Sequence, residues 1–187
     1  MKLKIIGVIV GIISISLFSI VDVSSIFGAR EVNIDLENHW IDQSGNTLDL
    51  RSSDHWTLIY SGFVGCGSTC PVAIQKMYSL SPIFKRENIQ LVFLSTDPLL
   101  SPSELQDYLD SQTNENYKMT GYIDKFGDPA NSLRKLKLFL YQGMNSHHSG
   151  DFILTSPNGS EAYILNDINE GKILPIVQNS QKLSKLL

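Results

Sequence analysis

The sequence predicts an α/β sandwich with a central mixed sheet, preceded by an N-terminal membrane segment. Three observations support this fold class: an uncharged apolar run opens the chain, β-rich runs then alternate with segments of helical periodicity, and a turn signal divides two further β-rich runs near the end. The 187 residues suffice for a membrane segment and one domain with its own core. Hydrophobic residues make up 42% of the chain, which argues against disorder.

The N-terminal segment is an uncharged run from Ile5 to Val21 that follows two lysines. Its length is near the lower limit for a helix that spans a membrane. The same run would also serve as the apolar region of a secretory signal, with an acceptable cleavage site at Val23-Ser24-Ser25. We therefore expect residues 1–21 to be a membrane anchor or signal. Because the lysines should stay on the inner side, the remainder of the chain then lies in the periplasm or another extracytoplasmic space.

We expect residues 22–33 to form a tether and residues 34–187 to form one domain, because neither a repeat nor a second linker is visible. The net charge is −4, and no basic cluster occurs in the domain. This charge distribution argues against nucleic acid as a partner.

The first half of the domain predicts a small hairpin and two buried strands joined by a helix. A turn over residues 43–46 separates the two arms of the hairpin. The runs Trp56–Val64 and Ile89–Ser95 are β-rich and mostly apolar, as in buried strands. Between them, helical spacing predicts one helix from Pro71 to about Arg86. Its apolar positions are Val72, Ile74, Met77, Tyr78, Leu80 and Phe84.

The second half predicts further helices and a terminal hairpin. Ser103 is the expected N-cap of a helix that ends near Gln112. Asn158-Gly159 is a strong hairpin signal, and Pro175 lies close to the expected start of the closing helix. The remaining predicted elements are a strand over 117–123, a helix over 130–140, strands over 152–156 and 162–165, and the closing helix from Ile173.

Both cysteines lie in one loop, Gly65-Cys66-Gly67-Ser68-Thr69-Cys70-Pro71, directly after the first buried strand. A cysteine loop between a strand and its helix is typical of the thioredoxin-like fold. Pro71 fits best at the first helical position, which places Cys70 at the N-cap and Cys66 in the preceding loop. Since a helix N-terminus favours thiolates, we expect lowered thiol pKa values here.

Redox or metal chemistry explains this cysteine pair better than a structural disulfide, because closing so short a loop stabilises a fold only weakly. Two thiolates suit Cu(I), and an added imidazole would let the site hold Cu(II) as well. Of the four histidines, His39 and His55 are expected at the surface. His147 and His148 lie in a long polar loop that also contains Met144. The loop composition does not select between these two histidines.

The chain resembles the SCO/SenC family of copper chaperones over roughly residues 34–187. The run from Gly62 to Pro71 is similar to the family's Gly-Phe-x-x-Cys-x-x-x-Cys-Pro, and Ser95-Thr96-Asp97-Pro98 is similar to its Ser-x-Asp-Pro. The family's metal-binding histidine lies nine residues before the proline of a Pro-x-Gly turn, and His148 holds this place relative to Pro157. The chain departs from the family at Gly67-Ser68, where Pro-Asp is common, and at His147, where Asp is common.

The resemblance implies a thioredoxin-like domain that binds Cu(I) or Cu(II) through Cys66, Cys70 and His148. It also implies a copper-receiving partner, a subunit of cytochrome c oxidase. Such proteins either give copper to the copper centre of that oxidase or reduce the thiols of this centre. His147 is a secondary candidate ligand. Asp97 is expected to hydrogen-bond within a turn.

Two other function classes compete with this interpretation. General exported thiol-disulfide oxidoreductases usually carry Cys-x-x-Cys and a cis-proline before the strand that starts here near Phe152, where this chain has Gly150. A dedicated membrane-anchored thiol-disulfide oxidoreductase therefore remains the alternative. Peroxiredoxin-like peroxidases need Thr or Ser three residues before the reactive cysteine, and Phe63 and Gly67 stand there instead. The leading expectation is a copper-transfer protein rather than an enzyme.

Overall fold

The computed structural model describes residues 29–35, 39–67, 69–112, 117–138, 140–141, 147–148 and 150–184. The expected N-terminal membrane segment, residues 1–21, lies outside these ranges. Within them, no helix is both long enough and apolar enough to cross a membrane.

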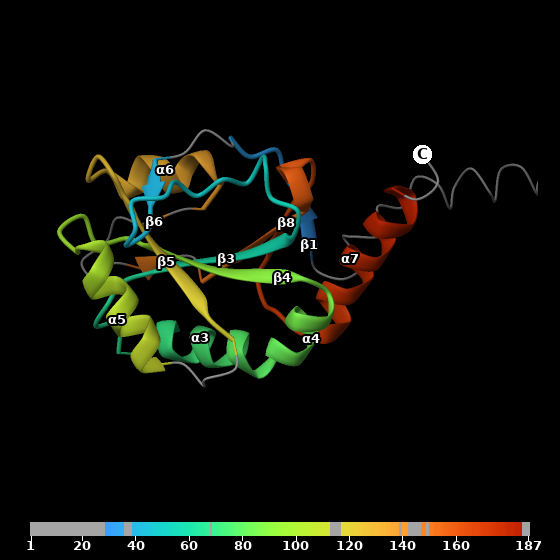
Figure 1. Cartoon of the computed structure of the whole chain (residues 1–187), viewed down its shortest axis with the longest axis horizontal. Coiled ribbons are helices and arrows are strands. Elements are labelled where there is room, and N and C mark those ends of the chain that lie inside the picture. The colour runs from blue at the N-terminus through green and yellow to red at the C-terminus, as the bar shows by residue number, and fades with distance from the viewer. Residues whose placement is uncertain are drawn as a thin grey trace, which may run out of the picture.

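A seven-stranded mixed sheet forms the centre of the molecule, in the order β1-β9-β8-β3-β4-β5-β2 (Figure 1). The three strands β3, β4 and β5 run parallel, and every other pairing in this sheet is antiparallel. The strands are β1 (Ala29–Glu31), β2 (Trp40–Ile41), β3 (Trp56–Gly62), β4 (Ile89–Ser95), β5 (Met119–Asp124), β8 (Phe152–Thr155) and β9 (Ala162–Leu165). A separate two-stranded sheet pairs β6 (Leu140–Tyr141) with β7 (His147–His148).

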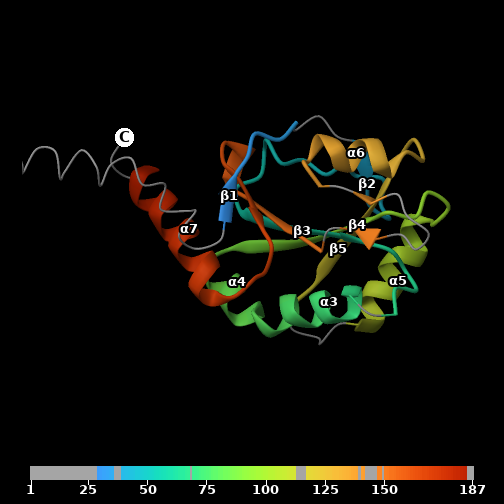
Figure 2. The same ribbon diagram turned by 180° about the vertical axis from the view of Figure 1, so that it is seen from behind.

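Helices cover both faces of the central sheet (Figures 1 and 2). Residues alternate between the faces along each strand: Leu58 and Tyr60 pack into one cluster, and Ile59 into the other. The first cluster is completed by α3 (Thr69–Ser79), α4 (Ser81–Arg86), α5 (Pro102–Gln112) and α7 (Glu170–Ser184). The second is covered by α6 (Pro129–Lys135) and by the segment around β2. The expected α/β sandwich, with thioredoxin-like placement of the cysteine loop, is therefore confirmed.

The helix expected from Pro71 to Arg86 is instead two helices, so that prediction is wrong. α3 ends at Ser79, and α4 begins at Ser81 with Pro82 in its first turn. Pro82 has no backbone N–H to donate to the preceding turn, so it interrupts the hydrogen-bond ladder of the first helix, and it is favoured in the first turn of the second. Val72, which was assigned to the apolar face, is 65% exposed.

Two other helix starts differ from the prediction. The hydroxyl of Ser101, not Ser103, accepts a hydrogen bond from the Glu104 N–H at the start of α5, and the Glu104 carboxylate accepts one from the Ser101 N–H. This reciprocal capping box satisfies two backbone donors, and it places Pro102 at the first helical position. α7 starts at Glu170 and includes Pro175.

The sheet also reaches further toward the N-terminus than expected. Residues 29–31, which were placed in the tether, form β1 and pair with β9. The terminal hairpin is confirmed: β8 and β9 are antiparallel, and Asn158 and Gly159 take positive φ values of 61° and 64° in the turn that joins them.

Candidate metal centre

The candidate site lies at the edge of the sheet where the three parallel strands end. β3, β4 and β5 deliver their C-terminal loops to this edge, on the left in Figure 1. The loop after β3 carries both cysteines. In open sheets with parallel strands this edge is where ligands usually bind.

A tight turn brings the cysteine loop back toward α3. The N–H of Cys66 donates to the carbonyl of Phe63 over 3.3 Å, and Gly65 has a φ of +90°. These values describe a turn with glycine in the position that requires positive φ. α3 starts at Thr69, so Cys70 lies in its first turn rather than at the expected N-cap. The N–H of Cys70 points at the sulfur of Cys66 over 3.4 Å.

The two thiols, which are not joined by a disulfide, differ in burial. Cys66 is 9% exposed, whereas Cys70 is completely buried. The sulfur of Cys70 fits against the strand because Gly62 has no side chain: a Cβ added there would lie 2.7 Å from this sulfur. Glycine is therefore required at position 62 by close packing. Cys66 is the sulfur that an incoming group reaches first.

The thiol pKa of Cys70 departs from the expected direction. The pKa of this thiol is raised to about 12, chiefly by burial and then by the neighbouring Cys66 thiol. Hydrogen bonds from the Phe63 backbone and the Tyr60 hydroxyl act in the opposite direction. The prediction of a lowered pKa is wrong for Cys70, because desolvation of a thiolate here outweighs the favourable helix terminus. At neutral pH Cys70 is a neutral thiol, and a metal ion that binds it must displace its proton.

Two tyrosines border the thiols, and the sequence analysis did not identify either as part of the site. Burial, followed by the nearness of Cys70, raises the pKa values of both Tyr60 and Tyr108. Tyr60 lies two residues before Gly62 on β3 and so shares its face of the sheet. That strand periodicity was the available signal for Tyr60. The ring of Tyr60 packs against Phe93 and Phe152, with centroid distances of 5.9 and 5.0 Å.

His147 and His148 form β7, in which His148 stands opposite Leu140 on β6. The side chains of this histidine pair lie outside what the structure describes. Two residues later, Gly150 lies beside the start of α3, because a Cβ added there would be 3.9 Å from the Thr69 methyl group. The backbone that follows His148 therefore approaches the cysteine loop. Among the described side chains, which do not include that of His148, no three His, Cys, Asp or Glu residues are grouped so that they could hold a metal ion.

The remaining sequence candidates make local contacts of their own. His39 is exposed, and its ring meets Phe126 edge to face at 4.6 Å. His55 is partly exposed and contacts Asp54 and Gln90. Asp97 makes the expected turn, in which its N–H donates to the Ser95 hydroxyl and its carboxylate accepts from the N–H of Leu99.

Comparison with known proteins gives a consistent family. The SCO1/SenC family model matches residues 31–174. A Stutzerimonas stutzeri protein named for copper binding is 30% identical over 133 residues, which cover 64% of this chain and 61% of that protein, less than two thirds of its length. Yeast Sco1 with copper bound superposes with a TM-score of 0.62 and 24% identity, over 77% of this chain and 86% of that chain. A SCO1/SenC family lipoprotein from Bacillus anthracis superposes with a TM-score of 0.65 and 21% identity, over 83% and 98% of the two chains.

Proposed function

This chain belongs to the SCO1/SenC family, and on that premise we propose that it is a copper-binding metallochaperone whose ligands are Cys66, Cys70 and His148. Its partner is the copper centre of cytochrome c oxidase, to which it delivers copper or whose thiols it reduces. Residues 1–21 anchor it to a membrane, and the segment from residue 22 to the start of β1 at Ala29 connects the anchor to the domain. The domain works in the periplasm or an equivalent extracytoplasmic space.

One observation carries the proposal: two thiols meet at the start of α3, with the N–H of Cys70 3.4 Å from the sulfur of Cys66. Sulfur ligands select soft ions such as Cu(I) over the harder divalent ions. The approach of Gly150 to Thr69 supports His148 as the third ligand, because only one residue separates His148 from Gly150. An imidazole would extend the site's range to Cu(II).

Transfer proceeds by ligand exchange at this site. The partner's thiolate replaces Cys66 first, because this sulfur is the more accessible of the two. Cys70 and His148 then release the ion, and the Cys70 thiol regains a proton because burial favours its neutral form. Copper therefore passes between proteins without being released to water.

The test is copper binding by the reduced chain and by two matched variants, His148→Ala and His147→Ala. We expect one tightly bound equivalent of Cu(I) in all three proteins. Cu(II) binding and its thiolate absorption band should be lost in His148→Ala and kept in His147→Ala. Wild-type affinity for both ions in His148→Ala would reject His148 as a ligand, and no tight copper binding by the wild type would reject the chaperone function.

The alternative is a dedicated membrane-anchored thiol-disulfide oxidoreductase that uses the redox pair Cys66 and Cys70. Their adjacency favours it, because the same two thiols can be oxidised to a disulfide. Gly150, with a φ of +69°, stands where a thioredoxin-type enzyme would place a proline, and proline cannot adopt that angle. This position therefore argues against a general thioredoxin-type enzyme, but not against a dedicated one. Rapid dithiol exchange without copper binding would favour this second function.

A further inference from the structure

Three large apolar side chains are exposed on the described part of the chain: Val72 at 65%, Leu99 at 92% and Phe126 at 68%. Each follows a different parallel strand. Val72 lies in the start of α3 after β3, Leu99 follows β4, and Phe126 follows β5. All three therefore belong to the sheet edge that carries the cysteine loop, the left-hand end in Figure 1. We name this set of residues the apolar rim.

We propose that the apolar rim is the docking surface for the protein that exchanges copper at Cys66 and Cys70, and that this partner presents apolar contacts bordered by Lys and Arg. The inference rests on the proposed function and assigns a surface to it. Docking is required because Cys66 is 9% exposed and Cys70 is buried, so a partner's ligand reaches them only in direct contact.

Hydrogen bonds fix the two rim loops. The N–H of Leu99 donates to the Asp97 carboxylate over 2.9 Å, and the N–H of Phe126 donates to the Asp124 carboxylate over 2.9 Å. The loops also touch each other, because a Cβ added at Gly127 would lie 4.0 Å from the Pro98 carbonyl oxygen. Leu99 and Phe126 are thus held in solvent by ordered turns. Burial of apolar surface contributes about 25 cal/mol of favourable free energy per Å², so a partner that covers these side chains gains this contribution on binding.

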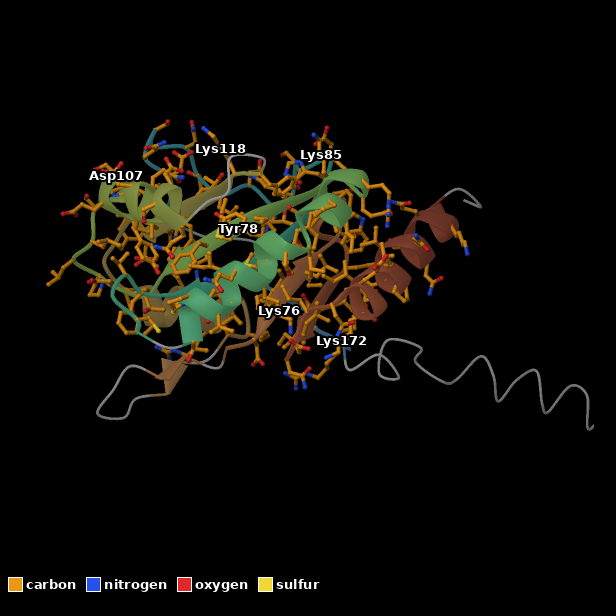
Figure 3. The ribbon with its side chains drawn as sticks, turned by 90° about the horizontal axis from the view of Figure 1, so that it is seen from below. Lys76, Tyr78, Lys85, Asp107, Lys118 and Lys172 are labelled. Carbon is orange, nitrogen blue, oxygen red and sulfur yellow. The ribbon has the colours of Figure 1, made fainter. Side chains whose placement is uncertain are left out.

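The charges near the rim indicate which occupant fits. α5, which begins three residues after Leu99, has three exposed acidic residues and no basic residue: Glu104, Asp107 and Asp110. Lys125, beside Phe126, is an exposed basic residue at the same edge. Figure 3 shows Asp107 at the α5 end of the molecule, with Lys118 between it and Lys85, and with Lys172 farther away. A second copy of this chain that docks through α5, or an anionic membrane, would bring like charge to the acidic residues of α5, whereas a basic partner surface is complementary to them.

The experiment measures copper transfer from the loaded full-length protein to the reduced cytochrome c oxidase subunit of the same organism that holds the copper centre. Leu99→Ser and Phe126→Ser remove apolar contact, and Leu99→Met and Phe126→Leu are matched controls that keep it. We expect the second-order rate to fall at least tenfold in each serine variant and by less than twofold in each control. Copper affinity should be unchanged in all four, and the wild-type rate should fall as salt is added.

Serine variants that transfer copper at the wild-type rate would overturn the docking surface while leaving the proposed function intact. A wild type that binds copper but transfers none would reject the proposed delivery and, with it, the partner assigned to the rim. Two further measurements would identify a different occupant of the apolar rim. A wild-type dimer that Leu99→Ser converts to monomers, or binding to phosphatidylglycerol vesicles that Leu99→Ser abolishes, would also overturn the proposal.

Discussion

The corners after β3 and β5 occupy equivalent places at one edge of the sheet, yet their polar groups are used differently. Each leads from a parallel strand into a helix with a proline near its start, Pro71 in α3 and Pro129 in α6. After β5, the buried carboxylate of Asp124 accepts hydrogen bonds from the N–H groups of Phe126 and Asp128 and from the Ser132 hydroxyl. After β3, the N–H of Cys70 donates to a weak acceptor, the sulfur of Cys66.

This difference separates structure from chemistry. A carboxylate that satisfies three donors in the interior is costly to disturb, so the β5 corner contributes to folding stability. A thiol can exchange its proton for a metal bond, and sulfur is a weaker hydrogen-bond partner than a carboxylate, so the β3 corner is available for ligand binding. The scaffold is therefore stabilised beside the site rather than within it.

Removing a thiol should give the largest functional change. In Cys70→Ser we expect copper affinity to fall at least about 100-fold, because a hydroxyl is a poor ligand for a soft ion. The free energy of unfolding should fall by much less than the free energy of copper binding, since the Cys and Ser side chains have similar volumes. Competition with a Cu(I) chelator measures the affinity, and urea unfolding measures the stability. Near-normal copper affinity in this variant would remove Cys70 from the ligand set.

Asp124→Ala should show the opposite pattern. Loss of the buried carboxylate leaves three donors unpaired, and we expect a loss of about 3 kcal/mol in unfolding free energy with little change in copper affinity. Asp97→Ala is the matched control at the neighbouring corner, where the carboxylate accepts one N–H bond, from Leu99. It should lose less than about 1 kcal/mol. Equal losses in the two variants would contradict the contrast between the corners.

The sequence predicted the fold best where one pattern of side chains ran without interruption. Ile89–Ser95 was predicted with its observed bounds because a short run of apolar β-formers is typical of a buried strand. The break at Pro82 was missed because apolar spacing continues from α3 into Phe84, although the proline was itself a visible signal.

The site was predictable in part. The cysteine pair and its place near the start of α3 came from the residues alone, although Cys70 lies inside the helix rather than at its N-cap. The choice of His148 rests on the family resemblance and remains a proposal. The raised pKa of Cys70 was not predictable from the sequence, because it depends on how far α3 buries this sulfur against β3. Local sequence indicates a helix dipole but not the depth of a side chain.

Gly62→Ala tests the packing that positions the buried thiol. Its Cβ would lie 2.7 Å from the Cys70 sulfur and 2.9 Å from the Phe93 ring, so α3 or the ring must move. We expect a loss of about 1–3 kcal/mol in stability, together with weaker copper binding. Gly67→Ala is the control in the same loop, because a Cβ there meets nothing within 4 Å. Equal effects of the two substitutions would show that loop flexibility, not close packing, explains the glycine at position 62.

Tyr60→Phe should give the smallest change, in the pH dependence of copper binding. The Tyr60 hydroxyl lowers the pKa of Cys70, against the larger effect of burial. Without this hydroxyl the pKa of Cys70 rises further, so protons compete with copper up to a higher pH. We expect the midpoint of copper binding to move upward by less than about one pH unit, since one neutral hydrogen bond contributes about 1 kcal/mol. Tyr108→Phe should move it less, because no hydrogen bond to Cys70 contributes to the pKa of Tyr108, only burial and the charges of the two thiols. A midpoint that stays fixed or moves downward in Tyr60→Phe would show that the hydroxyl does not stabilise the thiolate, and the β3 corner would then depend on its backbone and Cys66 alone.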